Sequence, residues 1–113
     1  MDIEKYELME SAKEYCPKLI HGIKREIENH RCGTIWDSSN ILLISEGMQF
    51  LLKALSTSTN KPNQEDYNRA LEYLNDLAVA VQDNDNVSIT DILEYELLPF
   101  VQELSETLNR IKL

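Results

Sequence analysis

The feature that most constrains the fold is a spacing of three and four residues between apolar side chains, which is densest toward the end of the chain. Within residues 87–112 the spacing joins Ile89, Leu93, Leu97, Phe100, Leu104, Leu108 and Ile111. At 100° per residue these seven side chains span about a third of a helix circumference, while Ile92, Tyr95 and Leu98 lie outside that arc. We therefore predict an amphipathic helix whose first half is apolar nearly all round, so that it is either deeply enclosed or meets a partner.

The same periodicity recurs in three earlier stretches and predicts helices over about residues 3–31, 34–55 and 64–82. The side chains expected to be buried are Met9, Ala12, Cys16, Leu19, Ile20, Ile23 and Ile27 in the first stretch, Ile41, Ile44, Met48, Leu51 and Leu55 in the second, and Tyr67, Ala70, Leu71, Leu74, Leu77, Ala78 and Val81 in the third. The second stretch carries another stripe, made of Leu43, Gly47, Phe50 and Ala54. That helix is therefore expected to touch more than one neighbour.

Four amphipathic helices with polar links and no strand pattern predict an all-α protein. We expect an antiparallel four-helix bundle, up-down-up-down, formed by one domain over residues 1–113. Pro17 and Pro99 fall inside the first and last helices and should kink them, because proline lacks an amide hydrogen and its ring clashes with the preceding turn. Gly22 and Gly47 each cost roughly 1 kcal/mol in a helix interior, and a close crossing of the two helices at these glycines would compensate for that cost.

The charge balance argues against two classes of partner. The 113 residues carry a net charge of -9, which repels both nucleic-acid phosphates and anionic lipid surfaces. The sequence shows neither a basic leader followed by an apolar run nor a window approaching the ~18 apolar residues of a membrane span. A cytoplasmic location is expected, with Cys16 and Cys32 as reduced thiols.

Metal sites and catalytic motifs are predicted to be absent. Asp83, Asp85, Asp91 and Glu94 match four positions of a calcium-binding loop, but Ser88 occupies the position that requires glycine. Residues 89–94 are better explained as helix.

The other candidate ligands are too few to form a site. Cys16 with His21, or His30 with Cys32, supplies at most two zinc ligands where a structural site needs four. Neither histidine has the Glu-x-x-His spacing of a di-iron bundle. With three glycines in the chain, a phosphate-binding loop or a nucleophile elbow cannot be written. We predict no cofactor, no metal, no catalytic residue and no enzymatic activity.

Glu96 is the acid whose position is least expected. On the helical wheel it lies about 20° from Ile89 and about 40° from Ile92 and Phe100, so it is on the rim of the buried stripe or within it. A carboxylate in that place must be paired or have a raised pKa. We expect it to pair with a Lys or Arg of a neighbouring helix.

Three blocks of sequence stand out, at residues 15–23 (YCPKLIHGI), 44–51 (ISEGMQFL) and 91–99 (DILEYELLP). In this order they resemble a small acidic all-helical family of Gram-positive bacteria with no established function. The resemblance implies a four-helix fold and an association with flagellar or surface-assembly components, and it supplies no catalytic residues. Cys16 and His21 depart from the apolar and acidic residues expected at their positions.

The leading functional hypothesis is a non-enzymatic interaction or chaperone-like bundle. Its partner would be an amphipathic helix of another protein, or a second copy of the chain, held against Phe50, Ile92, Tyr95 and Leu98. A first alternative is a small-molecule or metal-binding bundle, possibly an enzyme, with Glu46, Tyr95 and Glu96 facing an interior cavity. A second alternative is a structural homodimer with an isologous interface.

Overall fold

The computed structural model describes residues 3–32, 38–58 and 64–110, and these form an all-helical bundle. Its elements are α1 (Ile3–Arg31), α2 (Ser38–Ser58), α3 (Gln64–Gln82), α4 (Asn86–Asp91), the π-helical segment η1 (Ile92–Leu97) and α5 (Leu98–Arg110). Because α4, η1 and α5 follow one another without a gap, they make up one long last helix. The predicted bounds of the first and third helices are confirmed. The second helix continues three residues beyond its predicted end, and its predicted start at residues 34–37 lies outside the described residues.

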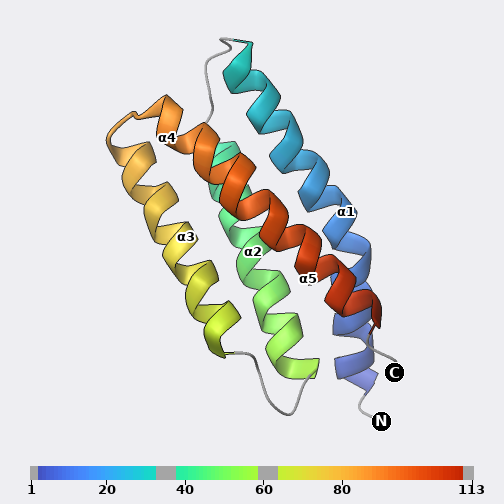
Figure 1. Ribbon diagram of the computed structural model, residues 1–113. Coiled ribbons are helices and arrows are strands. Elements are labelled where there is room, and N and C mark those ends of the chain that lie inside the picture. The colour runs from blue at the N-terminus through green and yellow to red at the C-terminus, as the bar shows by residue number, and fades with distance from the viewer. Residues whose placement is uncertain (1–2, 33–37, 59–63, 111–113) are drawn as a thin grey trace.

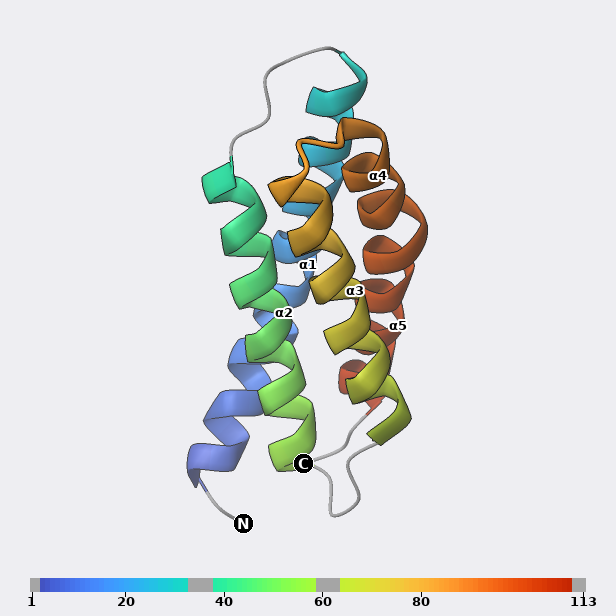
Figure 2. The ribbon, with the colours of Figure 1, turned by 90° about the vertical axis from the view of Figure 1, so that its left-hand side faces the viewer.

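The four long helices run up-down-up-down, as Figure 1 shows, and the bundle measures 48 × 23 × 20 Å. Helix α1 packs closely against both α2 and α5, and α3 packs against α4 and η1. The seam between α2 and α3, which faces the viewer in Figure 2, is packed less closely than those three. The predicted antiparallel four-helix architecture is therefore confirmed, with one of its four seams looser than the others.

The core contains most of the side chains that periodicity selects. The buried ones predicted for α1, α2 and the last helix are Met9, Ala12, Cys16, Leu19, Ile23, Ile27, Ile41, Ile44, Met48, Leu51, Ile89, Leu93, Leu97, Phe100, Leu104 and Leu108. The structure adds Leu52, Ala80 and Val101, which the sequence did not indicate. The predicted core positions Leu55 and Ile111 lie outside the described side chains.

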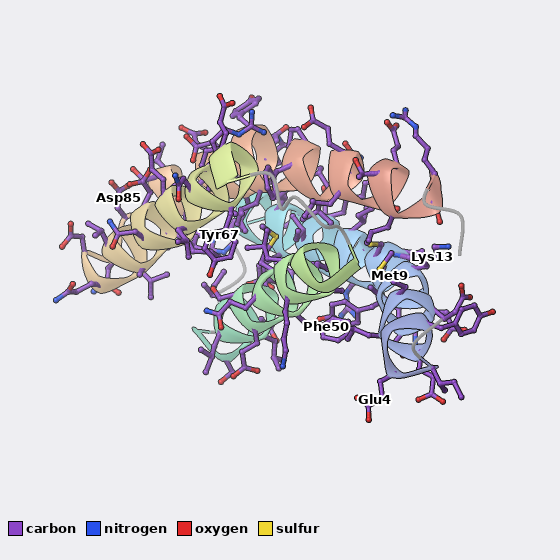
Figure 3. The ribbon with its side chains drawn as sticks, turned by 90° about the horizontal axis from the view of Figure 1, so that it is seen from below. Glu4, Met9, Lys13, Phe50, Tyr67 and Asp85 are labelled. Carbon is purple, nitrogen blue, oxygen red and sulfur yellow. The ribbon has the colours of Figure 1, made fainter. Side chains whose placement is uncertain are left out.

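The predicted stripe of α3 is partly wrong: its members Ala70 and Leu77 are buried, but Ala78 is exposed. Tyr67 and Leu71 are exposed at 39% and 44%, and Tyr67 lies on the side of α3 nearest α2 in Figure 3. Ala80 is buried instead, and Tyr73 packs edge-on against Phe100 with ring centroids 5.9 Å apart. These two lie about 120–180° around the helix from Tyr67 and Leu71. Helix α3 is thus turned toward the last helix, and its side toward the looser α2 seam is left partly open.

The two prolines are accommodated differently. Helix α1 continues through Pro17 over all of its 29 residues. Before Pro99, the last helix adopts the π-helical segment η1, a feature that the expected kink did not include. A π turn has a wider hydrogen-bond ring, from residue i to i+5, and it is frequently found at functional sites.

The expected crossing of Gly22 with Gly47 is also wrong. A Cβ added at Gly47 would lie 2.9 Å from Cε1 of Tyr15, so Gly47 provides room for the Tyr15 ring. A Cβ added at Gly22 would meet no atom within 4 Å. Gly47 therefore allows a close approach between α1 and α2, whereas Gly22 borders open space.

Candidate functional site

The four side chains predicted to bind a partner come from two helices and differ in burial. Phe50, labelled in Figure 3, is half-buried at the contact between α2 and α1. Its ring centroid lies 5.6 Å from that of Tyr15, with an interplanar angle of 86°. Ile92 borders a hollow whose other wall is α3. Ile92 and Leu98 are half-buried against the core, while Tyr95 is 68% exposed.

The residues expected to face an interior cavity, Glu46, Tyr95 and Glu96, come from two helices and do not line a common hollow. Glu46 and Tyr95 are exposed, so neither faces the interior. Neither of them, nor Glu96, is among the residues that line the hollows described below.

Glu96 is in a different environment from the one predicted. Its Oε2 atom is buried and has no hydrogen-bond partner in the part of the chain that the structure describes. Burial raises the pKa of its carboxyl, and the nearby carboxylates of Asp76 and Glu72 on α3 raise it further. The expected Lys or Arg partner is wrong, because the charged groups that act on Glu96 carry the same sign.

The hollow beside Ile92 extends this acidic character. It has a volume of about 350 Å³ and lies where α3 packs against α4 and η1. Apolar side chains of Val79, Ala80 and Ile92 line it together with Ser88 and the four aspartates Asp76, Asp83, Asp85 and Asp91. No basic residue is among the eight. Within residues 3–32, 38–58 and 64–110, no Lys or Arg forms a recorded ion pair with any of these aspartates.

Local sequence explains how this hollow forms. Asp85, labelled in Figure 3, is the N-cap of α4 and accepts hydrogen bonds from the backbone N–H of Ser88 at 3.1 Å and from its hydroxyl at 2.6 Å. These bonds lower the pKa of the Asp85 carboxyl. Asn84 adopts φ 53°, a left-handed conformation that asparagine tolerates. The turn between α3 and α4 is therefore tight, and it brings the aspartates at both helix ends to one side.

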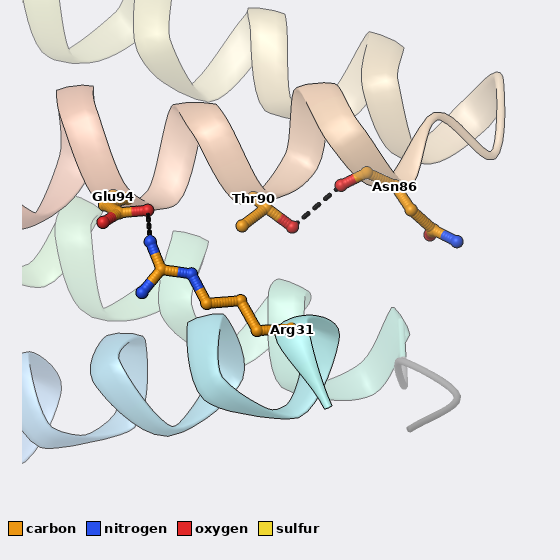
Figure 4. A network of polar contacts seen from close by, with 4 residues as sticks. All are labelled: Arg31, Asn86, Thr90 and Glu94. Carbon is orange, nitrogen blue, oxygen red and sulfur yellow. Dashed lines mark hydrogen bonds and ion pairs between the residues drawn. The ribbon is translucent and has the colours of Figure 1, made fainter. Parts of the chain in front are cut away.

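The calcium-loop residues have other roles. Asp85 caps the helix, and Glu94 accepts a hydrogen bond from Nη2 of Arg31 at the end of α1, as Figure 4 shows. The hydroxyl of Thr90 donates to the carbonyl oxygen of Asn86 at 2.8 Å. Residues 89–94 are helical, as predicted from the mismatches to the loop template.

Metal ligands and thiols add no second chemical site. Across the described ranges, no three His, Cys, Asp or Glu side chains converge in a way that could hold a metal ion. Both cysteines are free thiols, as expected. Cys16 is buried, and that burial raises its pKa; the exposed Cys32 has its pKa raised by a hydrogen bond to Glu28.

Sequence reasoning missed Asp76, Val79 and Ala80, which supply the α3 wall of the hollow. A signal was present, since the short connection at residues 83–86 predicts that α3 and the last helix are neighbours. The predicted stripe instead followed the large side chains of Tyr67 and Leu71 and left out the small Ala80.

The fold and this region together define a class: an all-α four-helix protein with an apolar, acid-rimmed hollow at one end of its last two helices. Among the described residues, none of the helices combines the length and apolar character needed to cross a membrane. The chain belongs to a family described as a domain of unknown function, DUF8042, whose model matches residues 7–107. No curated protein and no solved structure matched the chain.

Proposed function

We propose that the chain is a non-enzymatic interaction module that binds a basic amphipathic helix of a partner protein at the acidic hollow. The observation that carries the proposal is the combination of an apolar floor, made by Val79, Ala80 and Ile92, with four aspartates around it. A helix that docks in a groove places one or two apolar anchors into it. Lys or Arg on the flanks of the same helix would meet the aspartates.

Electrostatics favours a basic partner over an acidic one. Like charges brought together across an interface cost free energy, whereas opposite charges speed association and reject wrong partners. The hollow adds its aspartates to a chain of net charge -9. Glu96 and Glu72 extend the negative potential along η1 and α3. The same argument disfavours a homodimer formed through this hollow, because an isologous interface would face aspartates with aspartates.

The predicted contact residues take unequal parts in this proposal. Ile92 belongs to the hollow, and Tyr95 is an exposed aromatic three residues further along the same helix. Leu98 supports the core beneath them, and Phe50 is engaged by Tyr15. The implied link to flagellar or surface assembly, and a chaperone-like role toward such a partner, remain predictions.

Two peptides of matched length test the proposal. Both have Leu at the same amphipathic positions, and the remaining positions are Lys in one and Glu in the other. Fluorescence anisotropy should detect binding of the Lys peptide alone. The variant Asp76→Asn/Asp83→Asn/Asp91→Asn should weaken that binding about tenfold or more, since three charge contacts are lost.

A second triple variant separates a specific site from general attraction. Glu7→Gln/Glu14→Gln/Glu46→Gln changes the net charge equally on exposed parts of α1 and α2. It should leave the affinity within about twofold at physiological salt, where the Debye length is roughly 8 Å. Equal weakening by both triple variants would mean that net charge alone attracts the peptide, and the proposal would be wrong.

A further inference from the structure

A second hollow, of about 220 Å³, lies between α1 and α2 and shares no lining residue with the acidic one. Lys18, Gly22 and Arg25 of α1 border it at intervals of four and three residues, so they lie along one stripe of that helix. Asn40 and Leu43 of α2 border it from the other side. Gly22 leaves space between two basic side chains because no Cβ is present there, and one added would meet nothing within 4 Å.

The two basic side chains beside this space, Lys18 and Arg25, form no ion pair with the acidic residues that the structure describes. Arg31, Arg69 and Arg110 each pair with a glutamate. The chain holds 20 Asp and Glu against 11 Lys and Arg. Lys18 and Arg25 are therefore available to an anionic group from outside the chain.

A buried acid borders the same hollow. Glu26 is 3% exposed, and its Oε1 lies 3.7 Å from Nε2 of His30 one turn further on. At 3.7 Å this contact is too long for a hydrogen bond. A buried polar group is costly unless it is hydrogen-bonded, and a carboxyl group can accept several hydrogen bonds. Glu26 therefore favours a cationic donor within the hollow, while Lys18 and Arg25 favour an anion.

We propose that this hollow binds a small zwitterion of the amino-acid type with an apolar side group. Its carboxylate would lie between Lys18 and Arg25, and its ammonium would meet Glu26. Leu19, Leu43 and Ile44, which also line the hollow, would contact the apolar group. A small molecule such as leucine fits a hollow of this size.

Three related probes test each part of the ligand. L-leucine carries both charges, 4-methylpentanoate lacks the ammonium, and 3-methylbutylamine lacks the carboxylate. Each is titrated into the ¹⁵N-labelled full chain and followed by NMR chemical shifts. L-leucine at millimolar concentration should shift amides of residues 15–29 and 40–44 saturably. Each single-charge probe should bind about tenfold more weakly or worse, as expected when a charge-assisted hydrogen bond is lost.

Two exposed positions on α1 provide a variant and its control. Arg25→Gln should weaken L-leucine binding about tenfold. Lys24→Gln removes one positive charge from the same helix at a residue that does not line the hollow, and it should leave the affinity unchanged. Both substitutions replace exposed side chains, and circular dichroism checks that both variants remain helical.

Three results would overturn the proposal. The first is the absence of saturable shifts with L-leucine. The second is equal binding of 4-methylpentanoate and L-leucine, which would leave Glu26 without a role. The third is equal weakening by Lys24→Gln and Arg25→Gln, which would reduce the effect to net charge. None of these results bears on the peptide-binding function, because the two hollows share no residue.

Discussion

The backbone N–H of Leu98 donates to the carbonyl oxygen of Leu93, five residues earlier in the chain. This π-type bond closes the segment η1, directly before Pro99. Ile89, Leu93, Leu97 and Val101 follow one another at intervals of four residues, and each is 0% exposed. In a regular α-helix, a four-residue interval advances about 40° per step, so Ile89 and Val101 would differ by about 120°. A π turn holds more residues and thereby keeps all four directed into the core.

The wide turn makes Val101 a core residue, and Val87 provides a matched control. Val101→Ala should lower the free energy of unfolding by about 2 kcal/mol, because a fully buried side chain is truncated. Val87 is 72% exposed, so Val87→Ala should change it by less than about 0.5 kcal/mol. Urea denaturation monitored by circular dichroism measures both. Equal effects would contradict the burial of Val101.

The two helical glycines should respond to alanine in opposite directions. Gly22→Ala should stabilise the protein by about 0.5–1 kcal/mol, because alanine favours the helix and its Cβ meets no atom. Gly47→Ala should be destabilising, because its Cβ would collide with the Tyr15 ring, which Phe50 holds from the side. Thermal unfolding of the two variants provides the comparison.

The contact between Gly47 and Tyr15 can be tested further in a Tyr15→Leu background. There the penalty of Gly47→Ala should shrink, because the colliding ring is absent. An undiminished penalty would show that the glycine is needed for some other reason.

Glu96 should make the protein less stable as the pH rises. Its pKa in the folded state is raised above the ordinary value of 4.5 by burial and by Asp76 and Glu72. Between the ordinary and the raised pKa, the folded state binds more protons than the unfolded state, so the free energy of unfolding falls as the pH increases through that window. Above the raised pKa, this contribution is constant and unfavourable.

Glu96→Gln should therefore be more stable than the wild type at neutral pH and lose that advantage below the ordinary glutamate pKa. Urea midpoints measured from pH 4 to pH 7 would show the two curves diverging as the pH rises. Glu46→Gln, at an exposed position on α2, should give a curve parallel to that of the wild type. Parallel curves for Glu96→Gln as well would contradict the environment described for Glu96.

Tyr95 offers a cleaner test of partner binding than Leu98 does. Because Tyr95 is 68% exposed, Tyr95→Ala should change the free energy of unfolding by less than about 0.5 kcal/mol. Leu98 packs partly against the core, so Leu98→Asp should lower stability through burial of a charge. Reduced binding of the Lys peptide by Tyr95→Ala, measured at unchanged stability, would place Tyr95 in the interface. Unchanged binding would limit the site to the hollow around Ile92.

Much of the bundle could be predicted from the chain because helical periodicity is a local property. The apolar stripe of α1 determines which side of that helix is buried. Six of the seven side chains predicted for this stripe are buried in the structure. In α3 the same reasoning failed at Tyr67 and Leu71. Their hydrophobicity indicates a buried side, but the looser packing against α2 leaves them exposed.

The candidate sites were less predictable, since they combine residues from two helices. Ile92 and Asp76 are distant in sequence and meet only because α3 turns toward the last helix. The expected pairing of Glu96 with a cation failed for the same reason: the sequence places an acid near the core, but only the packing shows which charges face it.

The sequence by itself determined the four helices, their alternating directions and most of the core, because the spacing of apolar side chains acts within each helix. Tertiary structure decided what the helices present to one another. Packing widened the last helix at η1, seated Tyr15 over Gly47, left an open space at Gly22, and gathered Asp76, Asp83, Asp85 and Asp91 around Ile92. Each of these depends on the rotation of one helix relative to its neighbour, which is set by contacts between residues far apart in the chain.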